Sequence, residues 1–313
     1  MALGRLPRFA PRQLILMTSA SPLMRSIVFP TALLLVLACT RSNSSPSADE
    51  MRTSSTSAPP ATPGLPAGEA DAAERLRSSP RHGEWAMVAA GASDSVRAWV
   101  VFPERRDKAP VVVVVHEIFG LTPWIRAVAD QLAADGFVAI APDLLTGKNI
   151  QEGPEGPLRE SAVAAVRALD QSEVQRRLDF VARYAMALPA ALPKYGIVGF
   201  CWGGSASFAH AVHTQSLGAS VVYYGSSPSP EQLGAVRAPV LGLYGEDDAR
   251  VNSTVPPADS AMKALGKAFE YHYFPGAGHG FLRAQTGQNG ANLAATSDAW
   301  PRTVKWFRDH LEG

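Results

Sequence analysis

Residues 195–212 read YGIVGFCWGGSASFAHAV, which predicts a strand, a sharp turn and a helix in direct succession. The apolar run before Cys201 is typical of a buried strand, and the Ala-rich run over residues 206–213 is typical of a helix. Only a short, Gly-containing turn separates the two. A unit of this kind indicates a fold in which strands and helices alternate along the chain.

The turn itself matches the nucleophile-elbow pattern, with Gly199 and Gly203 on either side of Cys201 and cysteine where serine is more usual. A nucleophile in this pattern occupies a strained turn, and a side chain two residues before or after it would collide with the adjoining strand or helix. The turn also aims the sulfur at the helix N-terminus, whose dipole favours a thiolate. A buried structural cysteine between chance glycines is the competing interpretation.

The rest of the chain alternates in the same way. Five consecutive valines at residues 111–115 form a β-branched run that is typical of a strand covered on both faces. The pattern predicts an α/β fold with a mostly parallel, doubly wound sheet and helices on both faces. Further strands are expected at residues 84–90, 96–102, 137–143, 219–225, 239–245 and 268–274, and helices at 124–134, 158–169, 173–187 and 300–311.

A cysteine nucleophile needs a general base, and the base needs an acid that orients it. Asp247 and Asp248 directly follow one expected strand, and His279 follows the next in a Gly-rich loop. Active sites of open α/β folds gather at the carboxyl edge of the sheet, so these side chains are expected to meet Cys201 there. His82, His210, His213, His272 and His310 are weaker candidates and are expected to be packing or surface residues.

Four motifs closely resemble those of the dienelactone hydrolase family, in the family's order and at nearly its separations. They are HEIFGL, GFCWGG, GEDDARV and PGAGHGF, at residues 116–121, 199–204, 245–251 and 275–281. The resemblance runs from about Glu84 to the end of the chain and implies an α/β-hydrolase fold of about eight strands with a Cys-Asp-His triad and no cofactor. By this resemblance Cys201 is the nucleophile, His279 the base and Asp248 the acid, with Asp247 as the fallback.

The resemblance also implies roles for three residues beside the triad. The backbone N–H groups of Trp202 and Ile118 are expected to form the oxyanion hole. Glu117 matches the family glutamate that neighbours the resting thiol and takes part in activating it. An ordinary solvated carboxylate at the start of a loop is the alternative for Glu117.

Substrate recognition follows less directly. In the enzyme that typifies the family, two arginines and a tyrosine hold an anionic dienelactone, and arginine is well suited to bind a carboxylate. Arg283 matches one arginine, and Arg159 falls at the other when the chain is counted back from Cys201 without gaps. The tyrosine position is Val163 here, and the nearby loop at residues 144–157 could shift the match, so a solvent-facing arginine is the alternative for Arg159.

The N-terminal region has the pattern of an exported protein. Met24 and Arg25 precede an apolar run over residues 27–38 that ends at Cys39; a helix across a bilayer needs about 20 apolar residues, so this shorter run indicates a secretory signal. The ending VLAC resembles the lipobox of bacterial lipoproteins, whose cysteine is lipidated. We therefore expect a signal peptide at residues 1–38, with Met24 as the better start, and a lipid anchor at Cys39.

The next residues predict a flexible tether. The segment 39–80 is rich in Ser, Thr and Pro and poor in large apolar side chains, apart from a short helix expected within residues 69–80. The hydrolase domain is expected at residues 81–313. Because Thr40 rather than aspartate follows Cys39, the expected location is the periplasmic face of the outer membrane, with a cytoplasmic protein as the alternative.

Composition excludes other classes of function. The 29 Lys and Arg residues balance 28 acids, without a basic run, which argues against nucleic acid as a partner. Two cysteines form no disulfide framework, and no Cys or His spacing suggests a metal site. The expected activity is hydrolysis of a lactone or small carboxylic ester through an acyl-enzyme. A thioesterase or general carboxylesterase is the rival enzyme, and an inactive lipid-anchored binding protein is the rival of another class.

Overall fold

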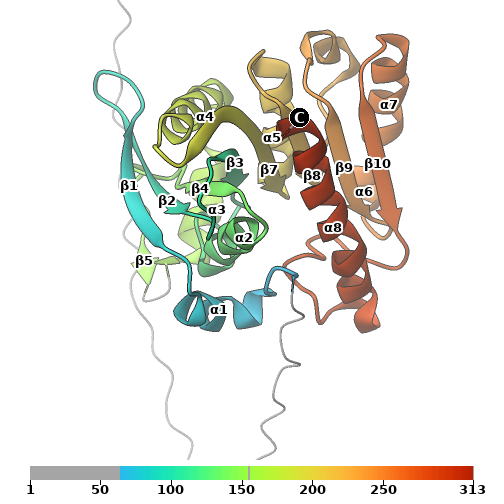
Figure 1. The fold of residues 1–313 in the computed structure, drawn as a ribbon. Helices are drawn as coiled ribbons and strands as arrows, with labels where there is room; N and C mark the ends of the chain where they lie inside the picture. Colours follow the sequence, from blue (N-terminus) through green and yellow to red (C-terminus); the bar gives the residue numbers. More distant parts are fainter. Residues whose placement is uncertain (1–63, 154–155, 313) are drawn as a thin grey trace, which may run out of the picture. The chain divides into compact units, whose positions relative to one another are not determined.

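The computed structural model describes residues 64–153 and 156–312 (Figure 1). Its main sheet contains eight strands in the order β1-β2-β4-β3-β7-β8-β9-β10. β1 pairs antiparallel with β2, β2 pairs antiparallel with β4, and the strands from β4 to β10 pair in parallel. The strands are β1 (Gly83–Ala89), β2 (Ser95–Val101), β3 (Ala109–Val115), β4 (Val138–Pro142), β7 (Ala191–Phe200), β8 (Ala219–Tyr223), β9 (Val240–Gly245) and β10 (Phe269–Phe274).

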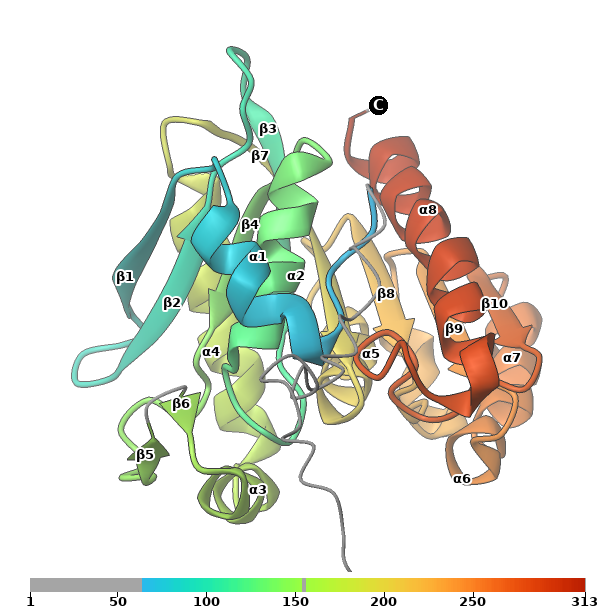
Figure 2. The same cartoon turned by 90° about the horizontal axis from the view of Figure 1, so that it is seen from below.

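Helices cover both faces of this sheet, which confirms the predicted doubly wound fold. α2 (Pro123–Ala134) and α8 (Ala291–Leu311) contact one face, while α4 (Gln171–Met186) and α5 (Trp202–His213) contact the other. α1 (Ala72–Ser78) lies across α2, as Figure 2 shows. The remaining helices and the small second sheet are η1 (Glu69–Asp71), α3 (Arg159–Arg167), η2 (Pro230–Ala235), α6 (Ala249–Asn252), α7 (Val255–Ala264), η3 (Gln288–Gly290), β5 (Glu152–Gly153) and β6 (Gly156–Pro157).

The valine run shows why the sheet has two apolar faces. Every residue of β3 is buried. Val111, Val113 and Val115 belong to the hydrophobic cluster on the α4 and α5 side, and Val112 and Val114 belong to the cluster on the α2 and α8 side. Successive side chains of a strand point to opposite faces, so an unbroken run of valines serves both cores.

The folded domain begins earlier than the predicted boundary at residue 81. Leu65, Ala67 and Ala72 are buried in the cluster that contains α2, or close to it. The indole Nε1 of Trp124 donates a hydrogen bond to the carbonyl of Ala67 at 3.1 Å. The short helix expected within residues 69–80 is present as α1, but it packs on the domain instead of belonging to a tether. The low apolar content of this segment concealed the few residues that anchor it.

The last helix also starts earlier than predicted. α8 begins at Ala291 instead of residue 300 and contains Pro301. Its first turns mix alanines, which favour a helix, with single Asn, Thr and Ser residues, and the burial of Asn292, Ala295 and Thr296 against the domain adds to that propensity. Among the described residues no helix is both long and apolar enough to cross a bilayer. The expected signal peptide and Cys39 lie outside the described residues.

Candidate active site

The candidate residues gather at the carboxyl edge of the parallel strands. Cys201 directly follows β7, Asp248 follows β9 and His279 follows β10. Glu117 follows β3, which is the neighbour of β7 in the sheet. The parallel order of the strands therefore brings side chains from distant parts of the sequence to one edge, as the sequence predicts.

Cys201 has the strained backbone of a nucleophile elbow, with φ 56° and ψ −116° at the N-cap of α5. The flanking glycines are required by contact: a Cβ on Gly199 would lie 1.9 Å from the carbonyl oxygen of Gly203. A Cβ on Gly203 would lie 2.4 Å from the carbonyl oxygens of Val115 and His116. The strand, the helix and the end of β3 therefore meet at distances that only glycine permits.

The resting Cys201 side chain is a thiol rather than a thiolate near neutral pH. Burial raises its pKa to about 11, and the nearby charge of Glu117 adds to the rise. The backbone N–H of Trp202 and the guanidinium groups of Arg250 and Arg283 act in the opposite direction. The helix N-terminus does favour the thiolate, as expected, but burial outweighs it in the resting site.

Asp248 and His279 form a close pair. Nδ1 of His279 lies 2.5 Å from Oδ2 of Asp248, and the carboxylate is buried whereas the imidazole is half-buried. A neutral imidazole that donates from Nδ1 leaves Nε2 free to accept a proton. Asp247, the fallback acid, has an exposed side chain. Asp248 is therefore the aspartate that orients His279.

Two neighbouring residues at the end of β8, Tyr223 and Tyr224, contact Cys201 and His279 respectively. The backbone N–H of Cys201 donates to the carbonyl of Tyr223 at 3.0 Å. The ring of the next residue, Tyr224, packs against the imidazole of His279 with the ring centroids 5.2 Å apart. Tyr224 has φ 39° and a buried hydroxyl without a hydrogen-bond partner among the described residues. It is a site residue that the sequence did not reveal, because an aromatic residue at a strand end is ordinary in a core.

The loop after β3 packs against the start of α5, the two segments expected to supply the oxyanion groups. The rings of His116 and Trp202 stack with their centroids 5.6 Å apart, which holds the start of α5 against this loop. Ile118 lies two residues after His116 in the same loop, and its backbone N–H and that of Trp202 therefore belong to adjoining segments. Such a pair of N–H groups suits an oxyanion.

Glu117 is buried, which removes the alternative of a solvated carboxylate. Only 2% of its surface is exposed, and burial raises its pKa to about 7. Arg283 opposes that rise because its Nε lies 2.7 Å from Oε2 of Glu117. The carboxyl group can therefore exchange a proton near neutral pH.

The two predicted arginines lie on either side of a third acidic residue. Glu69, in η1, forms ion pairs with Nη1 of Arg283 at 2.6 Å and with Nη2 of Arg159 at 3.0 Å. Both guanidinium groups also lie over the ring of Phe119, at 3.9 Å for Arg159 and 5.3 Å for Arg283. The structure thus brings Arg159 to the site although Val163 departs from the family pattern.

Two charged residues near the site were not predicted: Glu69, and Arg250, which lies in the motif GEDDARV but was given no role. Glu69 lies in a segment expected to be outside the domain, and Arg250 resembles an exposed charge after a strand. The weaker histidines have other partners. His210 contacts Gln175 and Tyr195, and His310 contacts the carbonyl of Trp306. The other three lie beside acids: His82 beside Glu84, His213 beside Asp179 and His272 beside Glu270.

Comparison with known proteins matches most of the folded chain to one family. The sequence model of the Dienelactone hydrolase family matches residues 96–311. The chain belongs to the dienelactone hydrolase family. Its membership makes it an enzyme that hydrolyses esters or lactones, and small-molecule esters or lactones are its class of substrate.

The relatives cover most of the folded region. The "Putative carboxymethylenebutenolidase" of Salmonella typhimurium is 31% identical over 266 residues, which cover 78% of this chain and 96% of that protein. Carboxymethylenebutenolidase 1 of Cupriavidus pinatubonensis is 32% identical and covers 64% of this chain and 86% of the relative. A solved "Putative Dienelactone Hydrolase" from Klebsiella pneumoniae has a TM-score of 0.62 at 28% identity, covering 72% of this chain and 98% of that chain. The dienelactone hydrolase of Anabaena variabilis shares the fold, with a TM-score of 0.56 at 21% identity over 74% of this chain and 99% of that chain.

Proposed function

We propose that this family member hydrolyses a lactone or small carboxylic ester through a Cys201-His279-Asp248 triad and a thioester intermediate. The observation that carries the proposal is the pairing of His279 with Asp248 at 2.5 Å, on the same sheet edge as a cysteine held at φ 56° on a helix N-terminus. A nucleophile, a base and an orienting acid are the parts that covalent acyl transfer needs.

The first half-reaction forms the acyl-enzyme. The sulfur of Cys201 attacks the carbonyl carbon. The backbone N–H groups of Trp202 and Ile118 donate hydrogen bonds to the carbonyl oxygen and stabilise the negative charge that develops on it. The carbon–oxygen bond of the ester then breaks. The alcohol leaves with the proton that the thiol gave up, which His279 delivers while Asp248 holds the imidazole tautomer.

Glu117 supports the activation of the thiol. Its pKa of about 7 lies between that of an ordinary carboxyl group and that of the Cys201 thiol, which is about 11. A carboxylate of this basicity, close enough to raise the pKa of the thiol, suits a transient acceptor that takes the thiol proton when substrate binds and passes it to His279 before the alcohol leaves. The loss of its own charge on protonation removes one of the two causes that disfavour the thiolate.

The second half-reaction restores the enzyme. His279 takes a proton from water, and the resulting hydroxide attacks the thioester carbon. The carbon–sulfur bond breaks, the carboxylic acid leaves, and the proton on His279 returns to the sulfur. An amide is more stable than a thioester, so an ester or lactone acylates a thiol more easily than a peptide does.

The experiment compares turnover by the parent protein and by Cys201→Ala. We expect the parent to hydrolyse short p-nitrophenyl esters or a dienelactone, and Cys201→Ala to lose at least about 10³-fold in kcat/KM. A preference for acyl thioesters or long-chain esters would assign the rival thioesterase or carboxylesterase activity. Hydrolysis that survives in Cys201→Ala would contradict the proposed nucleophile.

For the N-terminal region we propose export and lipidation at Cys39, which would place the enzyme on a membrane facing the periplasm. The support is the sequence alone: a basic start at Arg25, a short apolar run and the lipobox-like VLAC. Growth of an expressing bacterium with an alkyne-tagged palmitate tests this proposal. The parent protein is expected to take up the tag and Cys39→Ala to remain unlabelled, whereas an unlabelled, cytoplasmic parent would overturn it.

A further inference from the structure

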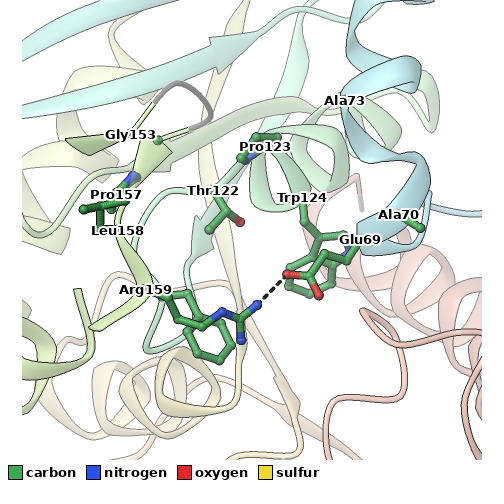
Figure 3. Close-up of a pocket in the computed structure, with 12 residues that line it drawn as sticks. Glu69, Ala70, Ala73, Thr122, Pro123, Trp124, Gly153, Pro157, Leu158 and Arg159 are labelled. Atoms are coloured by element: carbon green, nitrogen blue, oxygen red, sulfur yellow. Dashed lines mark hydrogen bonds and ion pairs between the residues drawn. The ribbon is translucent and has the colours of Figure 1, made fainter. Parts of the chain in front are cut away.

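A carboxylate of the protein itself, on the exposed residue Glu69, occupies the place where the family pattern puts a substrate carboxylate. Glu69 contacts both arginines that the sequence assigns to substrate binding, with Oε2 2.6 Å from Nη1 of Arg283 and Oε1 3.0 Å from Nη2 of Arg159. Figure 3 shows the carboxylate of Glu69 and the guanidinium of Arg159 facing each other. Each carboxylate oxygen therefore serves one arginine, as a bound carboxylic acid would.

We propose that Glu69 is a specificity-determining residue, which fills the arginine pair and directs the enzyme to esters that carry no charge at this end. The proposal rests on the proposed function, because it assigns the substrate class of that same site.

Both arginines already have acidic partners within the protein. Arg283 pairs with Glu117 as well as with Glu69, and Arg159 pairs with Glu69, so two acids face two arginines. The charge of Glu69 also contributes to the raised pKa of Glu117, which shows that the two acids influence each other. A substrate carboxylate would compete with Glu69 for both arginines, and it would have to displace the Glu69 side chain.

Glu69 belongs to a segment that the domain holds firmly on both sides. Its own backbone N–H donates to the carbonyl of Arg283 at 2.9 Å. Gln285 donates to the carbonyl of Pro66 at 2.8 Å, and Trp124 donates to the carbonyl of Ala67 at 3.1 Å. These bonds hold the backbone of Glu69 in place, and the two ion pairs with Arg159 and Arg283 position its side chain, which is 42% exposed.

The adjoining cavity suits an uncharged group. It has a volume of about 550 Å³ and is lined by Glu69, Arg159 and a mostly apolar set of side chains (Figure 3). Phe119 in its wall directly follows Ile118, whose N–H is expected to contact the oxyanion. Glu69 and Arg159, the charged residues of the lining, pair with each other, so the remaining wall offers mainly apolar contacts to a substrate. The apolar lining includes Phe119, Pro123, Trp124, Pro157 and Leu158.

The test uses two esters that differ in one charge: mono-p-nitrophenyl adipate and its methyl ester. Glu69→Gln keeps the shape of the side chain and removes its charge, and Glu74→Gln on the exposed side of α1 is the matched control. We expect Glu69→Gln to raise kcat/KM for the anionic ester about tenfold, chiefly through a lower KM. The neutral ester should change less than about threefold, and Glu74→Gln should alter neither.

A binding measurement separates this proposal from the proposed function. Calorimetric titration with adipate is expected to show about tenfold tighter binding to Glu69→Gln than to the parent or to Glu74→Gln, whether or not any ester is hydrolysed. In Arg159→Gln/Glu69→Gln the gain should fall away, because one of the two cationic partners is missing. Equal adipate binding by the parent and Glu69→Gln, with circular dichroism showing both folded, would overturn the role of Glu69. Absence of ester turnover alone would count against the proposed function only.

Discussion

At the scale of single residues, the site pairs a half-buried thiol, Cys201, with a buried carboxyl group, Glu117. Burial raises the pKa of Cys201 to about 11 and that of Glu117 to about 7, and the charge of Glu117 further raises that of Cys201. The sequence predicted both residues through the motifs GFCWGG and HEIFGL. It could not predict their protonation, because burial and the contact with Arg283 depend on the packing of distant segments.

Glu117 should make the stability of the fold depend on pH. Its pKa is raised in the folded protein from an ordinary 4.5 to about 7, so its contribution to stability is fully present below about pH 4.5 and is lost as the pH rises through 7. Between pH 5 and pH 8 the free energy of unfolding of the parent should fall by about 2 to 3 kcal/mol more than that of Glu117→Gln. Urea unfolding at both pH values measures this difference. Parallel pH profiles for the two proteins would contradict the buried, proton-exchanging carboxyl group.

At the scale of helices and strands, the nucleophile elbow is the unit that the sequence predicts best. Its strand, turn and helix were predictable from eighteen residues, 195–212, because apolar periodicity and the glycine spacing are local signals. The start of α8 was not, because the buried residues Asn292 and Thr296 are polar and give no apolar helical pattern, and their partners, such as Gly278, come from another segment. Short sequence patterns thus predicted the strand, turn and helix of the elbow, but they did not predict a helix start that is fixed by contacts with distant segments.

Gly199→Ala should test the close approach at the elbow. The new Cβ would lie 1.9 Å from the carbonyl oxygen of Gly203, so strand and helix would have to separate. We expect the variant to lose about 3 kcal/mol or more of unfolding free energy, or to fail to fold. Gly234→Ala is the control, because nothing lies within 4 Å of its Cβ position. A Gly199→Ala protein with the thermal stability of the parent would contradict the described contact.

The start of the domain is a property of the whole molecule. The segment from Gly64 to Arg81 has few apolar residues, and the sequence therefore predicted a tether there. In the structure Leu65, Ala67 and Ala72 are buried, and the segment supplies Glu69 to the site. No local pattern identifies such a segment, because its partners, among them Trp124, lie more than 50 residues along the chain.

Removal of this segment should destabilise the domain. Nε and Nη2 of Arg81 lie 3.0 and 2.5 Å from the carboxylate oxygens of Asp130, which is 2% exposed, so a chain that begins at His82 leaves a buried charge without its partner. We expect it to lose about 3 to 5 kcal/mol of unfolding free energy relative to a chain that begins at Gly64. Thermal unfolding followed by circular dichroism measures this. Equal melting temperatures for the two chains would place the segment outside the cooperative domain.

The proposed thioester on Cys201 can be observed through the intact mass of the protein, quenched in acid during turnover of a p-nitrophenyl ester. We expect a species heavier by one acyl group, which peptide mapping places on Cys201 and which hydroxylamine removes as expected for a thioester. Its level should rise in His279→Ala, where deacylation lacks its base, and it should be absent from Cys201→Ala. Ester hydrolysis in the parent without any acyl adduct, or with the adduct on another residue, would contradict covalent catalysis by Cys201.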